Sequence, residues 1–268
     1  MFLKSIFYRR HKEEAKEEIR EKNKDVLQEI MLIITQIKNE YSLEDYVNVQ
    51  FSDEYPINKG ITKFENNICY IEIGVEGCRG KKKLLEDEWI TLQNTIVHEL
   101  THAKNYVKMT QDTRDKLKDN LHSLTYFARQ LVDEYSAYKA ADDRYKQVVI
   151  NSSENSLQRA LKPFWFNKQF IQDTGLNAER RYDYFYDDCT AIIIHSIRNK
   201  KFPSIPETYS GYNATCKKIM EIVQEYNSKM PLDYDQYEEA GKKLWNALLL
   251  MVPVSFISNF KMNVGIKF

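Results

Sequence analysis

The segment His98-Glu99-Leu100-Thr101-His102 constrains the fold and chemistry of this chain more than any other. Two histidines four positions apart lie one above the other on a helix, so both imidazoles can reach the same metal ion. The glutamate between them lies beside that ion without needing to bind it, and its carboxylate can take a proton from a metal-bound water. The segment therefore predicts a helix that carries a catalytic zinc site.

The apolar residues around both histidines favour such a helix. They recur every three or four positions, which is typical of a buried helical face, and they are Trp89, Leu92, Ile96, Leu100, Ala103 and Val107. His98 and His102 lie beside this face, and the pattern predicts a helix over residues 85–108. The alternative is a pair of solvent-facing histidines that bind nothing.

A third zinc ligand must come from elsewhere, because a catalytic zinc usually keeps three protein ligands and one water. The metzincin pattern requires Gly at position 105 and His at 108, and Asn105 and Lys108 exclude that class. Glu134 is the candidate, because a carboxylate in an apolar helical stripe costs free energy unless it is paired or metal-bound. The stripe consists of Phe127, Leu131, Tyr138, Ala141 and Tyr145. The alternative is a salt bridge of Glu134 with Arg129 or Lys139.

The rest of the chain is predicted to be helical apart from one short β region. A long helix over 10–39 precedes three strands, at 47–51, 61–65 and 68–73, and Asn66-Asn67 suits a hairpin turn between the last two. A linker follows the histidine helix and leads to a second long helix over 121–148. Further helices are expected at 156–171, 177–199, 212–228 and 235–260.

Composition limits the partners and the compartment. The 39 basic and 39 acidic residues balance, so nothing favours nucleic acid or an anionic membrane as partner. No uncharged apolar run is long enough to span a membrane, and Met1–Arg10 is too short for a signal-peptide core. The four cysteines form no C-x-x-C pair and are expected to be reduced thiols of a cytoplasmic protein. Frequent Lys, Asn, Ile and Tyr indicate an AT-rich bacterial or phage genome.

The order of elements over residues 10–148 resembles the zincin metallopeptidases of the gluzincin type, in a compact minimal form. The motifs that carry the resemblance are the histidine segment and Glu134-Tyr135-Ser136-Ala137. It implies an α+β fold: a zincin-like core with a backing helix (10–39), a small three-stranded sheet, an active-site helix (85–108) and a glutamate helix (121–148). Residues 1–149 would form this catalytic core, and the all-helical residues 150–268 would form the other wall of the substrate cleft.

The resemblance also implies an activity and a ligand set. The expected protein is a Zn²⁺-dependent peptidase in which His98, His102 and Glu134 bind the metal and Glu99 is the general base. An extended peptide or protein substrate is expected to pair with the strand at 68–73 as an edge strand. Tyr182, Tyr184, Tyr186 and His195 are candidates, not distinguished from one another, for the donor that stabilises the oxyanion.

One position departs from the family pattern. Thermolysin-like relatives have an Asp four residues after the ligand Glu, where it orients the first histidine, and this chain has Tyr138 there. The side chains that orient the two histidines are therefore unassigned at this point.

Three alternatives remain open. The chain could be a non-catalytic, zinc-containing interaction or regulatory protein of a phage or mobile element, although a structural site has no use for Glu99. Glu76-Gly77-Cys78 resembles the Glu-Gly-Cys of peptide deformylases, but Cys78 precedes His98 by only 20 residues, fewer than in that family. His122, 20 residues after His102, is a rival third ligand that is expected near a helix start and away from the metal.

Overall fold

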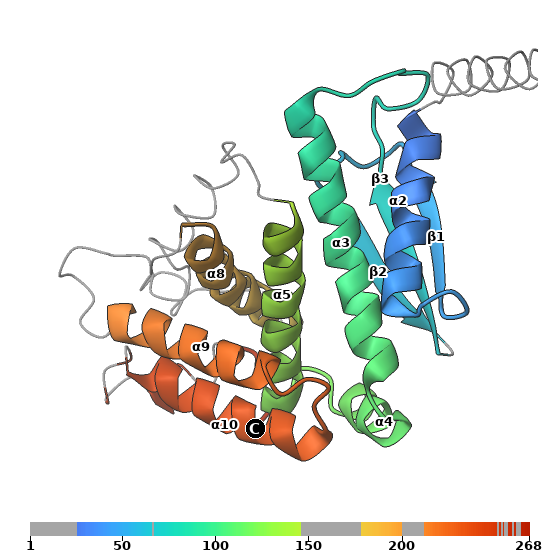
Figure 1. Ribbon diagram of the computed structural model, residues 1–268. Coiled ribbons are helices and arrows are strands. Elements are labelled where there is room, and N and C mark those ends of the chain that lie inside the picture. Colours follow the sequence, from blue (N-terminus) through green and yellow to red (C-terminus); the bar gives the residue numbers. More distant parts are fainter. Residues whose placement is uncertain are drawn as a thin grey trace, which may run out of the picture. The chain divides into compact units, whose positions relative to one another are not determined.

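A computed structural model of the chain (Figure 1) describes residues 26–65, 67–145, 178–199, 212–250, 252, 254, 257–258, 260 and 264–268. The described residues form seven helices and one small three-stranded sheet, a mixed and mostly helical fold. The chain divides into two compact units, residues 1–96 and 97–268, and the boundary falls within one helix, α3 (Glu86–Lys108). Each unit is described by itself below.

The first unit contains α2 (Val26–Tyr41) and the sheet. The helix predicted over 10–39 is confirmed from Val26 onward, and its residues Val26, Ile30, Ile34 and Ile37 form a buried apolar face. The Lys38 ammonium donates to the carbonyl of Val47 at 2.7 Å and so ties the end of the helix to the first strand. The predicted part of the helix before Val26 lies outside the described residues.

The sheet consists of β1 (Val47–Ser52), β2 (Gly60–Glu65) and β3 (Ile68–Gly74) in the order β1-β3-β2. β3 pairs parallel to β1 and antiparallel to β2, with Ile71 opposite Val49 on one side and Thr62 on the other. Cys69, Ile71 and Ile73 share the buried face of β3, as alternation requires. Asn67 has a φ of 66°, a value that asparagine tolerates in a tight turn between β2 and β3.

The expectation that residues 68–73 form an edge strand is wrong. β3 is the central strand, and its backbone groups on both sides already bond to β1 and β2. The parallel pairing of β1 with β3 cannot be read from local sequence, because it joins strands that are separated by β2 along the chain. Within the described sheet, a peptide could add only beside β1 or β2.

α3 follows the sheet and carries both motif histidines in its second half. The predicted apolar face is confirmed, because Leu92, Ile96, Leu100 and Ala103 are buried. In the first unit, the Thr95 hydroxyl donates to the Ile57 carbonyl at 2.9 Å. The helix ends at Lys108, as the sequence predicted.

The second unit contains the end of α3 and five further described helices: α4 (Gln111–Asp119), α5 (Leu124–Arg144), α8 (Ala178–Asn199), α9 (Tyr212–Asn227) and α10 (Tyr234–Leu249). The segment after Lys108, expected to be a linker, contains α4, which is capped by the Thr110 side chain. α5 begins three residues later than expected, because His122 has a φ of 62° and the Ser123 hydroxyl caps the helix.

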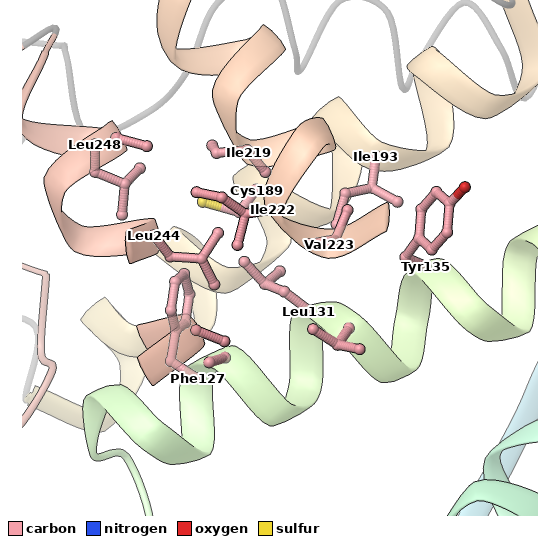
Figure 2. Packing of buried hydrophobic residues seen from close by; sticks show 14 of the residues in the cluster. Phe127, Leu131, Tyr135, Cys189, Ile193, Ile219, Ile222, Val223, Leu244 and Leu248 are labelled. Atoms are coloured by element: carbon pink, nitrogen blue, oxygen red, sulfur yellow. The ribbon is translucent and has the colours of Figure 1, made fainter. Parts of the chain in front are cut away.

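α5 packs against α8, α9 and α10 around one hydrophobic core. Figure 2 shows Phe127, Leu131 and Tyr135 of α5 facing this core, one helical turn apart. They meet apolar side chains of the other three helices, among them Cys189, Ile193, Ile219, Ile222, Val223, Leu244 and Leu248. The division expected at residue 149 stays a prediction, although helices from both sides of it share this core.

The ends of α8 and α9 lie within a residue of those predicted, whereas α10 ends at Leu249 rather than near 260. The amide of Leu250 bonds to the carbonyl of Ala247, three residues back, which tightens and ends the last turn. The helix predicted over 156–171 lies outside the described residues. In the described part of the chain, no helix has the length and apolar character needed to cross a membrane.

Candidate metal centre

Three side chains of the second unit converge on one point: His98 and His102 from α3, and Glu134 from the middle of α5. The two Nε2 atoms are 2.9 Å apart, His98 Nε2 is 3.6 Å from Glu134 Oε2, and His102 Nε2 is 3.8 Å from Glu134 Oε1. Tetrahedral zinc with bonds of about 2.0–2.1 Å separates its ligand atoms by about 3.3 Å. The two distances to Glu134 end on different oxygens of its carboxylate. Ligand atoms taken one from each residue all lie within 4.8 Å of one another, so the group could hold a metal ion.

The helices supply this arrangement through their periodicity. His98 and His102 are one turn apart on α3, and their rings meet edge to face with centroids 4.5 Å apart. On α5, Glu134 points away from the helical core that Leu131 and Tyr135 enter, which leaves its carboxylate for α3. The three side chains are 12% to 19% exposed, so the group is largely sheltered from bulk water.

Glu99 lies between the two histidines in sequence and is buried, with 6% of its surface exposed. Its negative charge helps to raise the pKa of His102, so the carboxylate lies within electrostatic reach of the histidine pair. Glu99 is not part of the group of described residues that could hold a metal, and its role as general base stays a prediction.

Asp133 lies at the opposite nitrogen of the His102 ring from Glu134 and His98. Its Oδ2 lies 2.9 Å from His102 Nδ1 and 3.1 Å from an Arg129 guanidinium nitrogen. The Asn105 amide donates to the other oxygen, Oδ1, at 2.7 Å. The side chain of Asp133 is only 5% exposed, and the donors around it balance the cost of burying its charge.

Two tyrosines complete the surroundings of the ligand group. The Tyr186 hydroxyl, from α8, donates to Glu134 Oε1 at 2.8 Å. Tyr138, at the position where the sequence departs from the thermolysin-like pattern, packs its ring against His98 with centroids 4.4 Å apart. At this position the chain therefore makes an aromatic contact with His98.

The charges of the site shift the pKa values of its members in opposite directions. Burial alone would lower the pKa of His102, but the carboxylates of Asp133, Glu134 and Glu99 outweigh it and raise the pKa to about 9. Burial would raise the pKa of Asp133, but His102 and Arg129 together lower it to about 2. For Glu134 burial prevails, and its pKa is raised despite His102 and the Tyr186 hydroxyl.

The other predicted site residues lie elsewhere. Tyr182 is buried and donates to Gln130, Tyr184 is 41% exposed, and His195 is buried at 3% exposure, as expected of a core histidine. The His122 ring packs against Tyr182, with centroids 4.7 Å apart. Cys78 is a buried free thiol. Neither His122 nor Cys78 belongs to the group that could hold a metal among the described residues.

The salt-bridge alternative for Glu134 named Arg129 and Lys139 as its partners. Arg129 forms its ion pair with Asp133, one turn along α5, and Lys139 forms its ion pair with Asp143. Both cations therefore form ion pairs with other carboxylates, and Glu134 faces the two histidines, although the charge of Arg129 also acts to lower the pKa of Glu134.

Asp133 and Asn105 were not identified from the sequence. A signal was present, since Arg129 and Asp133 are spaced i, i+4 on a helix and Asn105 is three residues after His102. These spacings are also common on exposed helices, so by themselves they do not point to a buried network.

Comparisons of the chain with protein-family descriptions, with curated proteins and with solved structures find no match. The chemistry of the site must therefore be argued from its own geometry.

Proposed function

We propose that this chain is a zinc-dependent peptidase with a compact gluzincin-like core. The observation that carries the proposal is the group formed by His98, His102 and Glu134, whose possible ligand atoms all lie within 4.8 Å of one another, with Glu99 buried at the position after His98. Two imidazoles and one carboxylate are the protein ligands of many catalytic zinc sites, in which the fourth position belongs to water. The proposed substrate is a peptide or protein.

The charge of the buried cluster also suits a divalent cation. With both histidines neutral, as metal ligands must be, Glu99, Asp133 and Glu134 carry three negative charges when ionised and Arg129 carries one positive charge, which leaves a net charge of −2. Buried charges are costly unless they are compensated. A divalent cation held by the three ligands would bring this cluster to neutrality.

Each residue of the site has a separate task in the proposed reaction. Zinc, when bound, lowers the pKa of its water to about 7 and polarises the scissile carbonyl. Glu99 accepts the proton of the attacking water on its carboxylate and then passes it to the leaving amine. A peptide bond is thereby hydrolysed, with the water's hydroxyl on the new carboxyl group and its proton on the new amine.

Tyr186 is the strongest of the four candidates for stabilising the oxyanion. Its hydroxyl contacts the ligand Glu134, whereas Tyr182 bonds to Gln130 and Tyr184 is exposed. The Tyr186 hydroxyl therefore lies beside the proposed metal centre, where the oxyanion would form. Such donors typically contribute about 3 kcal/mol to catalysis.

The test is a comparison of Glu99→Gln with wild type and with Glu86→Gln, a matched control at an exposed position of the same helix. We expect about one zinc per chain in all three proteins, by elemental analysis, because the ligands are unchanged. Peptide hydrolysis should be lost only in Glu99→Gln, because only this variant lacks the general base.

Unchanged turnover in Glu99→Gln would overturn the mechanism. A wild-type protein that binds zinc but cleaves nothing in a broad peptide library would favour a non-catalytic interaction protein. A protein that retains its zinc in both His98→Ala and His102→Ala would exclude the site itself.

A further inference from the structure

His102 is held at both of its ring nitrogens by adjacent residues of one helix. Glu134 and His98 face Nε2, at 3.8 and 2.9 Å, and Asp133 faces Nδ1 at 2.9 Å. Adjacent helical residues point about 100° apart, so two neighbouring carboxylates of α5 can reach opposite ends of one imidazole ring. The ring can therefore neither rotate nor flip without breaking a contact at one end.

Asp133 is itself held firmly. Arg129 lies one turn before it on α5, and Asn105 lies one turn after His102 on α3, so both helices contribute a donor. Each carboxylate oxygen accepts at least one hydrogen bond, and the side chain is almost fully buried. A carboxylate with this number of donors in a sheltered place has one orientation.

The chemical consequence concerns the tautomer of His102. A neutral imidazole carries its single proton on either Nδ1 or Nε2, and the hydrogen bond made by one nitrogen decides which. A carboxylate at Nδ1 keeps the proton there and leaves the lone pair of Nε2 for a metal, as outer partners of zinc-bound histidines commonly do. Arg129 offsets the charge of Asp133, which would otherwise add to that of Glu134.

We propose that Asp133 is a positioning residue of the metal centre, which sets the tautomer and orientation of His102 and is held in place by Arg129 and Asn105. In thermolysin-like proteins, an Asp at the position of Tyr138 orients the first histidine of the motif. Asp133 would orient the second histidine instead, from the position directly before the ligand glutamate. This inference rests on the proposed zinc site.

The experiment compares Asp133→Asn with Asp143→Asn, which makes the same chemical change at an exposed position of the same helix. We expect Asp133→Asn to raise the dissociation constant for zinc about 10- to 100-fold, the usual effect of losing an outer partner. The cobalt-substituted variant should have an altered visible spectrum, because its His102 ring is reoriented. In ¹⁵N NMR of the zinc-loaded protein, the Nδ1–H signal of His102 should weaken or disappear. Asp143→Asn should match wild type in all three measurements.

Loss of the partner of Arg129 could prevent Asp133→Asn from folding, so Asn105→Ala serves as a second variant. It keeps Asp133 and its ion pair but removes one donor, and it should weaken zinc binding in the same direction by a smaller factor. If both folded variants bind zinc as wild type does, with unchanged cobalt spectra, this inference is overturned and the proposed peptidase stands. If wild type itself binds no zinc, the proposed function and this inference are overturned together.

Discussion

At the scale of single residues, Glu134 is the ligand on which the proposed three-ligand metal site depends. The two histidines come from one helix and meet by periodicity alone, whereas Glu134 must be brought to them by the packing of a second helix. Its side chain is 19% exposed, its carboxylate accepts from Tyr186, and its pKa is raised because partial burial disfavours its charge. A bound cation would remove that penalty.

We predict that Glu134→Gln weakens zinc binding by at least about 100-fold, because a lost ligand should cost more than a lost outer partner. The amide keeps the size of the side chain and an acceptor for Tyr186, so the fold should survive. His122→Ala and Cys78→Ala should bind zinc as wild type does, as measured by competition with a chromogenic chelator. Wild-type affinity in Glu134→Gln together with a loss in Cys78→Ala would favour a deformylase-like arrangement instead.

The hydroxyl of Tyr186 provides a second prediction at this scale. Tyr186→Phe removes the donor to the buried Glu134 carboxylate, and hydrogen bonds to charged groups contribute about 1.5–3 kcal/mol. We expect the free energy of unfolding of the metal-free protein, from urea titration, to fall by about 1–2 kcal/mol. The control is Tyr70→Phe, where the residue is 41% exposed, and it should leave the free energy of unfolding unchanged. Equal stability of the two variants would mean that this hydrogen bond does not stabilise the fold.

At the scale of elements, α5 serves two surfaces at once. Phe127, Leu131 and Tyr135 enter the core shared with α8, α9 and α10, while Asp133 and Glu134 face the end of α3. The position of the metal ligands along α5 is therefore set by the same packing that stabilises the helical core. A substitution that disturbs the packing of α10 on α5 should therefore change the stability of the folded protein.

Gly241 tests this packing. A Cβ at this position of α10 would lie 2.8 Å from the backbone oxygen of Leu124, at the start of α5. Alanine improves helix propensity by about 1 kcal/mol relative to glycine, but overpacking typically costs about 1–3 kcal/mol. We expect Gly241→Ala to lower the melting temperature in spite of its higher propensity. Asn246→Ala, on the exposed side of the same helix, should raise it slightly. A stabilised Gly241→Ala would show that α10 and α5 are further apart in solution.

At the scale of the whole molecule, zinc would join α3 to α5 and should stabilise the folded chain. A ligand that binds only the folded state stabilises it by about 4 kcal/mol when its free concentration is 1,000 times its dissociation constant. We predict that a strong chelator lowers the melting temperature of the wild-type protein and that added zinc restores it. His98→Ala should melt at the same temperature with and without the chelator, and a chelator effect in that variant would place the stabilising metal elsewhere.

Much of the architecture could be predicted from local pattern. The apolar period of 3.6 residues predicted α3 closely, and signals for helix starts and stops predicted the ends of α8 and α9 to within a residue. The strand predicted at 47–51 is confirmed as β1. The predicted helix bounds were wrong where the conformation or the cap of a single residue decides where a helix begins. The positive φ of His122 delays the start of α5, and the Thr110 cap starts a helix where a linker was expected.

The sequence by itself determined which side chains could form the candidate site, because the spacing of His98, Glu99 and His102 on one helix needs no long-range information. Only the tertiary structure decided what surrounds them. That Glu134 faces both histidines, that Asp133 bonds to His102, and that β3 is central rather than an edge all depend on contacts between segments far apart in the chain. Such contacts depend on how the apolar faces of helices and strands pack together. The spacing of residues within one helix or strand does not indicate which other element will pack against it.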